Sequence, residues 1–469
     1  HSTERERERD HELLLVCVCV CVCVCLCPSV LFPPCARGMG LTARVLLTWA
    51  CLAVLVALPT VAQNILYAAS IPNPSVQGNT RQVMWSLQDN NSTQFQELGV
   101  TGNAVEALVF HDGTLFVGGN SMVATNDPDQ QVSQLFSFTG RTWSRPAVVE
   151  GGRVRAITQI PASQGILDNS PTLFLGGDFQ FVADMETPRL AMEDNDQGVW
   201  TGMGGGVSQS GGGSAYVTSL SRGSGFRIYV GGNFDAVNGT AASNVAYFVN
   251  SPDGMQSKYW DPMGDGVPSP VVDMTFEGNR LYTVGEFGVS YYSESTSSWT
   301  MLATVSGTLH SVAVTEDGSY LFVGGEFSSL TPTNGNSFNT SNLAVFNTNT
   351  ETWFSQQATG GAVYSIITTS SSVFVGGDFT ALNGVSILSL GRVATSALSS
   401  SGSSLPFTQV SFNPSVLGRV VALAYGGTGL TPVPPTPGVF NGAMASSFPL
   451  SLSLLLISAL VSVLLGVVL

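Results

Sequence analysis

Cysteine is missing from most of this chain of 469 residues. All eight cysteines lie in the first 51 residues, at positions 17, 19, 21, 23, 25, 27, 35 and 51. If the segment up to residue 62 is removed, as argued below, the mature chain has no thiol and cannot form a disulfide bond. An exported domain without disulfides needs a large apolar core, which a chain of this length can supply.

Positive charge is also scarce. Lys and Arg number 17 against 32 Asp and Glu, which gives a net charge of −15, and only 10% of the residues are charged. Lys258 is the one lysine of the mature region. A surface so poor in cations disfavours binding to nucleic acids and to anionic lipid headgroups.

Histidine is rare as well, since the chain after residue 62 has only His111 and His310. His111 lies in a Phe-His-Asp-Gly turn and His310 directly precedes a strand expected at 311–314, so we interpret both as loop or strand-end residues. His-Glu-x-x-His, Gly-x-Ser-x-Gly and Gly-x-x-x-x-Gly-Lys are absent, which removes common signatures of zinc, serine-hydrolase and nucleotide chemistry. Catalysis by a pair of carboxylates remains an alternative, because the central channel of a propeller can hold two of them at a catalytic separation.

The N-terminal segment does not have the pattern of a folded domain. Residues 1–38 alternate Glu-Arg and then Val-Cys, as translated dinucleotide-repeat DNA does, and a genuine apolar segment at 13–32 is the alternative. Residues 39–62 have the pattern of a secretory signal, with Arg44 before an apolar run at 45–58 and small residues at a cleavage site. We therefore expect the mature chain to begin near Gln63.

The C-terminal segment predicts a membrane anchor. Residues 450–469 are an apolar run with no basic residue after it, whereas a stop-transfer helix normally carries basic residues on its cytoplasmic side. Small residues at Asn441 and Gly442 precede this run, so residues 441–469 fit a glycosylphosphatidylinositol attachment signal, with a spanning helix as the alternative. Residues 426–440 are rich in Gly, Thr and Pro and predict a semi-rigid stalk.

A β-rich phrase repeats through the region 63–425. It reads Leu-Phe-Val-Gly-Gly-Asn at 115–120, Ile-Tyr-Val-Gly-Gly-Asn-Phe at 228–234 and Val-Phe-Val-Gly-Gly-Asp-Phe at 373–379. Its glycines are Gly118, Gly119, Gly176, Gly177, Gly231, Gly232, Gly285, Gly324, Gly325, Gly376 and Gly377. A β-rich period of 40 to 58 residues is typical of a propeller or solenoid, in which no single unit buries its apolar face alone.

Each repeat predicts four short strands, which make one propeller blade. The last strand is opened by an aromatic residue: Trp143, Trp200, Trp260, Trp299, Trp353 and, in the last repeat, Phe407. Residues 66–70 stand where a Gly-Gly strand should be, and Phe95 stands where the tryptophan should be. Residues 420–425 predict a first strand with no second one after it. We therefore predict an all-β, seven-bladed β-propeller closed by N-terminal strands two to four and a C-terminal strand one, with six blades as the fallback.

The recurring residues have structural explanations. A glycine pair in a strand indicates close packing or a bulge, and a tryptophan can fill the space between neighbouring blades. A polar residue follows each pair, at Asn120, Asp178, Asn233, Glu286, Glu326 and Asp378. We expect each of these side chains to bond backbone in its own turn, and a ring-shaped cation or glycan site is the alternative.

Two further patterns concern modification and metal binding. N-glycosylation sequons occur at Asn90, Asn91, Asn238 and Asn339, in polar stretches expected to be loops. The acidic turn at 193–198 contains Asp194 and Asp196 and has some character of a calcium loop. It lacks the glutamate context of an EF-hand, so a solvated turn is the favoured interpretation and Ca²⁺ the alternative; we expect no other cofactor.

The phrases Tyr-Val-Gly-Gly-Asn-Phe (229–234), Asn-Val-Ala-Tyr-Phe (244–248) and Trp-Asp-Pro-Met-Gly-Asp-Gly-Val (260–267) resemble those of Gly-Gly-Asp/Asn-Phe repeat proteins. These include the extracellular domain of fungal cortical markers of cell polarity and, more loosely, kelch and galactose-oxidase propellers. The resemblance covers roughly residues 64–425 and implies a membrane-tethered ectodomain that marks sites of growth. This chain is much shorter and lacks a cytoplasmic tail, and it has neither the cysteine nor the histidines of a galactose-oxidase copper centre.

The sequence thus favours a non-catalytic propeller on the outer face of the plasma membrane, reached through the secretory pathway. We expect it to be membrane-anchored and to bind a glycan or protein partner, with no nucleic acid, in surface organisation or cell polarity. The alternative is a secreted carbohydrate-active enzyme that uses channel carboxylates.

Overall fold

The computed structural model describes residues 63–71, 82–88, 96–111, 113–124, 131–140, 142–160, 172–194, 199–225, 227–249, 259–398, 404–410 and 418–428. The chain divides into two compact parts, 1–431 and 432–469, and every described residue belongs to the first. The predicted leader and the predicted anchor lie outside the described residues. In the part of the chain that is described, no helix is both long enough and apolar enough to cross a membrane.

The described strands pair antiparallel in four-stranded units that follow one another along the chain. Unit 1 consists of β35 (Arg419–Thr428), β1 (Gln63–Ile71), β2 (Gln82–Gln88) and the first half of β3 (Gln96–His111). Unit 2 consists of the second half of β3, β4 (Thr114–Ala124), β5 (Ser133–Phe138) and β6 (Trp143–Ser144). Unit 3 consists of β8 (Val154–Ile160), β9 (Thr172–Gly177), β12 (Leu190–Asp194) and β13 (Val199–Gly202).

The remaining units repeat this order. Unit 4 consists of β15 (Tyr216–Arg222), β16 (Arg227–Asn233), β19 (Val245–Val249) and β20 (Tyr259–Asp261). Unit 5 consists of β21 (Val271–Glu277), β22 (Arg280–Gly285), β23 (Gly288–Ser293) and the first half of β24 (Ser298–Val314). Unit 6 consists of the second half of β24, β25 (Tyr320–Pro332), β27 (Asn342–Asn347) and β28 (Thr352–Thr359). Unit 7 consists of β29 (Val363–Thr368), β30 (Ser372–Gly377), β33 (Leu390–Ala394) and β34 (Thr408–Gln409).

Short hairpins extend the connection between the second and third strand of several units. In unit 3, β10 (Phe181–Val182) pairs with β11 (Met185–Glu186) on one side and with β7 (Val149–Glu150) on the other. In unit 4, β17 (Ala236–Val237) pairs with β18 (Thr240–Ala241) and with β14 (Val207–Ser208). In unit 7, β31 (Ala381–Leu382) pairs with β32 (Val385–Ser386) and with β28 of unit 6, and in unit 6 β26 (Phe338–Asn339) pairs with β25. Two single turns of 3₁₀-helix complete the described elements, η3 (Ser210–Gly212) and η4 (Thr395–Ala397).

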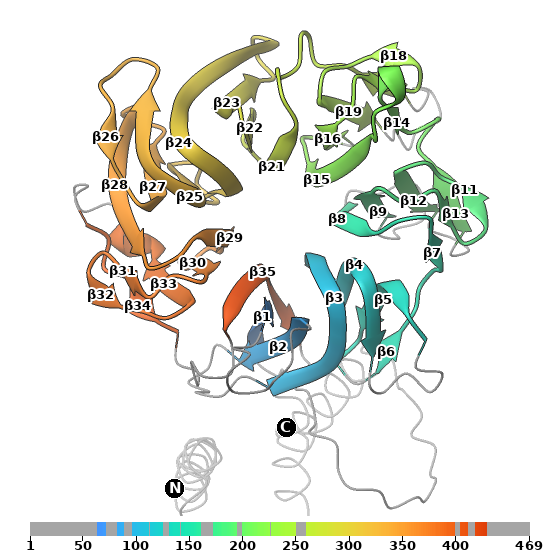
Figure 1. Ribbon diagram of the computed structural model, residues 1–469, viewed down its shortest axis with the longest axis horizontal. Helices are drawn as coiled ribbons and strands as arrows, with labels where there is room; N and C mark the ends of the chain where they lie inside the picture. The colour runs from blue at the N-terminus through green and yellow to red at the C-terminus, as the bar shows by residue number, and fades with distance from the viewer. Residues whose placement is uncertain are drawn as a thin grey trace, which may run out of the picture. The chain divides into compact units, whose positions relative to one another are not determined.

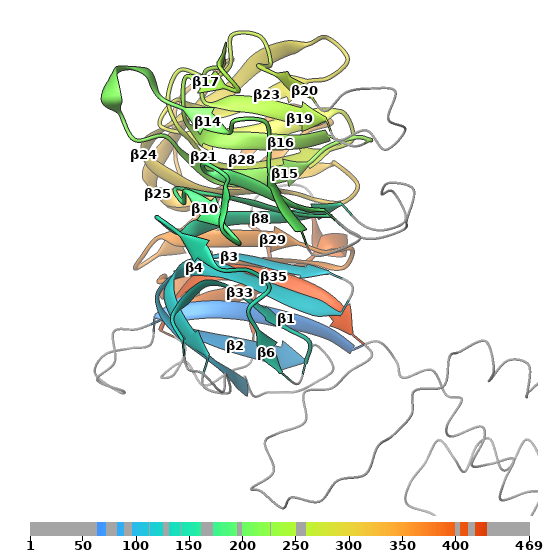
Figure 2. The same cartoon turned by 90° about the vertical axis from the view of Figure 1, so that its right-hand side faces the viewer.

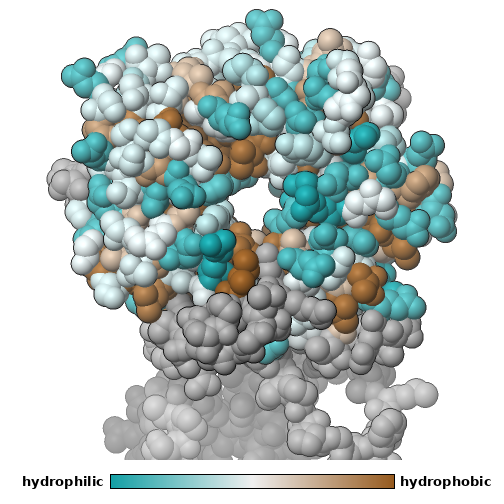
Figure 3. Space-filling model, viewed as in Figure 1, coloured by the Kyte–Doolittle hydropathy of each residue, from teal (hydrophilic) through white to brown (hydrophobic). Residues whose placement is uncertain are grey.

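The units form a ring around a central opening, and the first strand of each unit lies nearest to it (Figure 1). From the side, these inner strands run across the thickness of the disc (Figure 2). The space-filling view shows that side chains leave the opening unfilled (Figure 3). The prediction of an all-β propeller is confirmed, and the seven units agree with the predicted number of blades.

The two ends of the described chain meet in unit 1. β35 pairs antiparallel with β1 from Gln63↔Thr428 to Ile71↔Arg419, which is the pairing that the predicted closure requires. β35 continues past residue 425, the predicted end of the propeller, because Gly426 and Gly427 also pair with β1. The pairing covers the edge that β1 would otherwise expose and one edge of β35, which is the end strand of this sheet.

The buried apolar side chains gather between units rather than inside them. Each of the seven clusters among the described residues combines two neighbouring units, and one of them joins Leu66 and Ala68 of unit 1 to Phe374 and Leu390 of unit 7. Burial of apolar area stabilises a fold by about 25 cal/mol per Å². A single unit would therefore leave both of its apolar faces in water, as the repeat pattern predicts.

The glycine pairs lie where neighbouring chains come closest. A Cβ on Gly231 would overlap the side chain of Val271 in the next unit, and one on Gly232 would overlap the carbonyl oxygen of Tyr216 in the adjoining inner strand. The tryptophans connect each unit to the one before it. Three indole nitrogens donate to backbone oxygens there, from Trp143 to Leu98 (2.6 Å), from Trp260 to Met203 (2.9 Å) and from Trp299 to Met263 (3.0 Å). Trp200 Nε1 is buried without a partner among the described residues.

Two expected strand boundaries are wrong. β3 and β24 each run without interruption from the outer strand of one unit into the inner strand of the next. His310, expected just ahead of a strand, therefore lies inside β24. The reason is a bulge, because Leu309 pairs with Gly325 and Ser311 with Gly324, which leaves His310 as the extra residue.

Candidate functional site

Every inner strand carries an extra residue at the same place. Register shifts set one residue out of the ladder in each unit: Val421, Glu106, Arg155, Thr218, Val272, His310 and Tyr364, from unit 1 to unit 7. All seven are half-buried, while most of their neighbours along the strand are buried. The bulge therefore repeats around the opening and sets one side chain per unit apart from the packed interfaces.

Charged side chains join units 2 and 3 at this level. The carboxylate of Glu106 accepts from Arg153 Nη1 at 2.8 Å and lies 3.6 Å from Arg155 Nη1. Asp178 accepts from Arg155 Nη2 at 3.0 Å and from the backbone N–H of Arg153 at 2.7 Å. The Arg155 guanidinium also lies 5.0 Å from the ring centre of Tyr216 in unit 4.

A second charged group joins units 6, 7 and 1. Asp378 accepts from Arg419 Nη2 at 2.9 Å and from the backbone N–H of Ala362 at 2.6 Å. Arg419 lies 5.0 Å from the ring centre of Tyr364, and the imidazole of His310 packs against that ring at 5.2 Å. Burial lowers the pKa of His310, although the nearby carboxylates of Glu326 and Asp378 oppose this.

The charges at the opening favour ion pairing over acid catalysis. Burial opposes ionisation of Asp178, but the backbone N–H of Arg153 and the two guanidinium groups outweigh it, so the pKa of Asp178 lies below its ordinary value. A glycosidase acid needs a carboxyl whose pKa is raised enough to keep its proton. Asp178 is ionised near neutral pH and has no proton to donate.

The polar residues after the glycine pairs do not behave alike. Asp178 and Asp378 bind arginines besides backbone N–H groups, and Asn233 Nδ2 donates to the carbonyl oxygen of Ser214 at 3.0 Å. Glu286 and Glu326 are exposed. The expectation that each side chain bonds backbone within its own turn is therefore wrong for the two aspartates, because the inner strand lies within reach of their carboxylates.

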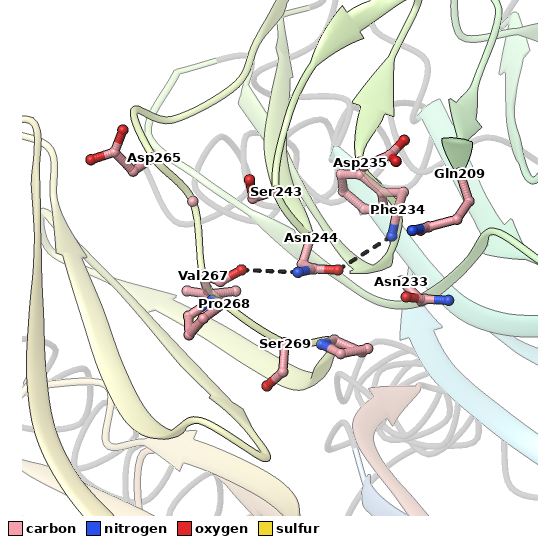
Figure 4. Close-up of a pocket in the computed structure, with 12 residues that line it drawn as sticks. Gln209, Asn233, Phe234, Asp235, Ser243, Asn244, Asp265, Val267, Pro268 and Ser269 are labelled. Carbon is pink, nitrogen blue, oxygen red and sulfur yellow. Dashed lines mark hydrogen bonds between the residues drawn. The ribbon is translucent and has the colours of Figure 1, made fainter. Parts of the chain in front are cut away.

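A polar pocket of about 500 Å³ lies between units 4 and 5. The loop after β16 forms one wall with the side chains of Asn233 and Asp235, and the connection from β20 to β21 forms the other with Asp265 and Ser269. Figure 4 shows Asp235 and Gln209 on one side of the pocket and Asp265 on the opposite side. The volume is within the range of small-molecule sites.

Asn244 holds the two walls together. Its Oδ1 accepts from the backbone N–H of Phe234 at 3.3 Å and its Nδ2 donates to the carbonyl oxygen of Val267 at 2.9 Å (Figure 4). The residue has a φ of 64°, a left-handed conformation that asparagine tolerates better than most residues. Asn342 has the same φ and the same pair of roles in unit 6.

The pocket offers mostly hydrogen-bond acceptors. Gln209 Oε1 and Ser269 Oγ are buried and have no hydrogen-bond partner among the described residues. The hydroxyl and N–H of Ser210 bind the carboxylate of Asp235 and hold its pKa below the ordinary value, so it is ionised. The carboxylate of Asp265 is exposed. These groups match a ligand that donates several hydrogen bonds, such as a polyhydroxylated one.

Other residues singled out from the sequence lie elsewhere. Asn238 is exposed at the turn between β17 and β18, while Asn339 is exposed but lies in β26 rather than in a loop. His111 ends β3, and Asp194 ends β12. Asn90, Asn91, Asp196, Asn441 and Gly442 lie outside the described residues. Among the residues that are described, no three His, Cys, Asp or Glu side chains gather as a metal site would require.

Sequence reasoning missed the pocket and the bulges. A signal for the pocket existed, because Ser-Asn stands at the start of the third strand or just before it, at 341–342 and 243–244. It marks the asparagine that bridges two loops, though not what those loops enclose. No composition signal marks the bulges, because the extra residue is a different amino acid in nearly every unit.

Comparisons with known proteins show no family for this chain. No family model matches the chain, and no curated protein matches it either. Among solved structures, the chain is similar to the crystal structure of the RRP9 WD40 repeats, at 12% sequence identity and a TM-score of 0.32. The match covers 50% of this chain and 60% of that one, so the chain spans about three-fifths of the structure that it matches.

Proposed function

We propose that this protein is a cell-surface, membrane-anchored, non-catalytic β-propeller that binds a glycan or protein partner, in surface organisation or cell polarity. A propeller fold suits a binding or scaffold role. The observation that carries the proposal is the pocket between units 4 and 5, where ionised and uncharged acceptors face one solvent-accessible space.

The chemistry of the pocket favours the glycan. A sugar ring carries adjacent hydroxyl groups, and carboxylate and amide oxygens accept from them in pairs. The side chains of Asp235, Asp265, Gln209 and Ser269 supply such oxygens from opposite walls. The described lining has no Lys or Arg, so an anionic ligand would find no counter-charge there.

The enzyme alternative has less support. Channel carboxylates at Glu106, Asp178 and Asp378 are ion-paired with arginines. These carboxylates are engaged in joining neighbouring units, and the lowered pKa of Asp178 leaves it without a proton to donate near neutral pH.

Binding to immobilised neutral oligosaccharides of glucose, mannose and N-acetylglucosamine tests the pocket. We expect the chain to bind at least one of these, and Asp265→Asn and Gln209→Ala each to weaken that binding about tenfold. Glu316→Gln, which removes an exposed carboxylate outside the pocket, is the matched control and should bind as the parent does. Unchanged binding in both pocket variants would show that the pocket is not the site.

The anchor is tested on cells that express the tagged full chain. Phosphatidylinositol-specific phospholipase C should release it into the medium. Retention on the cells with residues 450–469 still present by mass would instead make this segment a spanning helix.

A further inference from the structure

The short sheet of unit 3 exposes an aromatic ring between two carboxylates. In this sheet Phe181 of β10 pairs with Glu186 of β11 on one side and with Glu150 of β7 on the other. Directly paired residues on neighbouring strands project to the same face, with Cβ atoms about 5 Å apart. Phe181 and both glutamates therefore share one face.

This shared face points away from the core. The alternate pairs, Val182 with Val149 and with Met185, occupy the opposite face, where Val182 and Val149 are buried. Phe181 keeps 40% of its surface exposed, Val148, two residues before Glu150, keeps 56%, and Glu150 and Glu186 are exposed too.

The same three positions in sibling units carry nothing of this kind. In unit 4 they are Ala236, Ala241 and Ser208. In unit 7 they are Ala381, Ser386 and Thr359. The hairpin needs only small uncharged residues on its outer face to fold, so the ring and the two carboxylates of unit 3 are not required by the architecture.

We propose that the outer face of the β7–β10–β11 sheet docks a partner protein through a basic segment, with a lysine or arginine side chain seated over Phe181 between Glu150 and Glu186. A cation is attracted to the face of an aromatic ring, and two flanking carboxylates bind the same cation. Asp184, exposed at the tip of the hairpin, adds a third negative charge. Charge complementarity thus selects a basic partner, whereas the pocket of the proposed function selects a neutral one.

The β7–β10–β11 sheet also ends in a strand whose outer edge is unpaired within that sheet. β11 is the last strand of this sheet, and an extended peptide can add to such an edge through main-chain hydrogen bonds. Its alternate side chains would then lie over the outer face. An extended segment that alternates basic and small residues fits this register.

The test uses the full chain and a labelled decapeptide of alternating Arg and Thr, with a Glu-Thr decapeptide as the negative probe. We expect only the Arg-Thr peptide to bind, with an affinity that falls as salt rises. The double variant Glu150→Gln, Glu186→Gln should weaken binding about tenfold, and Phe181→Ala about threefold, in keeping with an exposed cation–aromatic contact.

A second double variant, Glu316→Gln with Glu351→Gln, removes two exposed carboxylates elsewhere and gives the same net charge. It should bind the peptide as the parent does. Equal weakening in both double variants would mean nonspecific attraction to an acidic protein. Unchanged binding by Phe181→Ala would mean that the ring takes no part. Either result overturns the proposal, as does failure of the Arg-Thr peptide to bind. The thermal midpoint of Phe181→Ala is measured beside its binding, because part of the ring is covered, and the variant must be folded at the assay temperature. Oligosaccharide binding by the pocket is a separate readout.

Discussion

The residue after the bulge is alanine in units 1 to 3, the alanine half, and polar in units 4 to 7, the polar half, where unit 7 carries Ser365. In units 4 to 6 this side chain accepts a hydrogen bond from a backbone N–H of the next unit: Ser219 from Met274 at 3.1 Å, Asp273 from Val312 at 2.9 Å, and Ser311 from Ile366 at 3.0 Å. In the alanine half, Ala422, Ala107 and Ala156 are buried and cannot accept.

Next to the bulge, the alanine half is joined by ions instead, whereas the ion pair of the polar half, Arg227 with Glu294 at 2.8 Å, lies at the other end of β16. Arg153 and Arg155 of unit 3 bind Glu106 of unit 2, and Arg419 of unit 1 binds Asp378 of unit 7. These side chains keep between 21% and 45% of their surface exposed. Units with the same bulge are thus joined by hydrogen bonds in one half and by ion pairs in the other. The stability of the two halves should therefore respond differently to substitution, salt and pH.

The largest effect should come from Asp273→Ala. The carboxylate accepts from the N–H groups of Met274 and Val312 and from the hydroxyl of Ser219. Removing it leaves donors in the interface without an acceptor, which costs about 2–3 kcal/mol in the free energy of unfolding. Urea denaturation of the purified protein measures this loss.

Asp273→Ser is the matched control, because serine occupies this position in units 4 and 6. It keeps an acceptor for Val312 and should cost roughly 1 kcal/mol. If Asp273→Ala were no more costly than Asp273→Ser, the hydrogen bonds between the inner strands would contribute nothing to stability.

A smaller effect should come from Glu106→Gln in the ionic half. The pair is partly exposed, so after screening by solvent its loss should cost about 0.5 kcal/mol at low ionic strength. In 1 M NaCl the difference from the parent should largely vanish, since the screening length falls to about 3 Å. The cost of Asp273→Ser should change little with salt, and equal salt dependence in the two variants would remove the distinction between the halves.

The repeat pattern predicted the fold because the residues that recur are those that each unit needs in order to pack against the next. Gly231 and Gly232 mark a close approach of strands, and Trp260 marks the space between two units, so their recurrence along the chain predicts both the strands and their stacking. The pairing of β1 with β35 followed from counting strands at the two ends of the repeat region.

The sites could not be predicted in the same way, because they depend on what differs between repeats. Glu106 and Arg155 stand at equivalent positions of neighbouring units, and only the register shift of each inner strand reveals that they meet. Gln209 and Ser269 reach one pocket from loops 60 residues apart, each two residues after the phrase Trp-x-x-Met-Gly-x-Gly-Val at 200–207 and 260–267. The phrase marks two equivalent loops, but it does not say that they face one pocket.

The smallest expected effect is the change in folding stability with pH. It is also the most specific, because the contribution of Asp273 should rise and that of Asp178 should fall as the pH falls. Burial raises the pKa of Asp273 above its ordinary value, although Val312, Met274 and Ser219 oppose this. The folded state then holds a proton that the unfolded state has lost, so stability falls as pH rises through the window above the ordinary aspartate value. Asp178 has a lowered pKa in the folded state. Its contribution to folding stability is therefore fully present above the ordinary aspartate pKa and is lost as the pH falls through the lowered pKa.

Two variants isolate these contributions when unfolding is measured between pH 3 and pH 7. As the pH falls, the stability of the parent relative to Asp273→Ser should rise, because the parent carboxyl becomes protonated and loses its desolvation cost. Over the same range, the stability of the parent relative to Asp178→Asn should fall, because protonation breaks the pairs with Arg153 and Arg155. Two curves of the same slope would mean that the two aspartates are in equivalent surroundings, and the contrast between the halves would then be one of geometry alone.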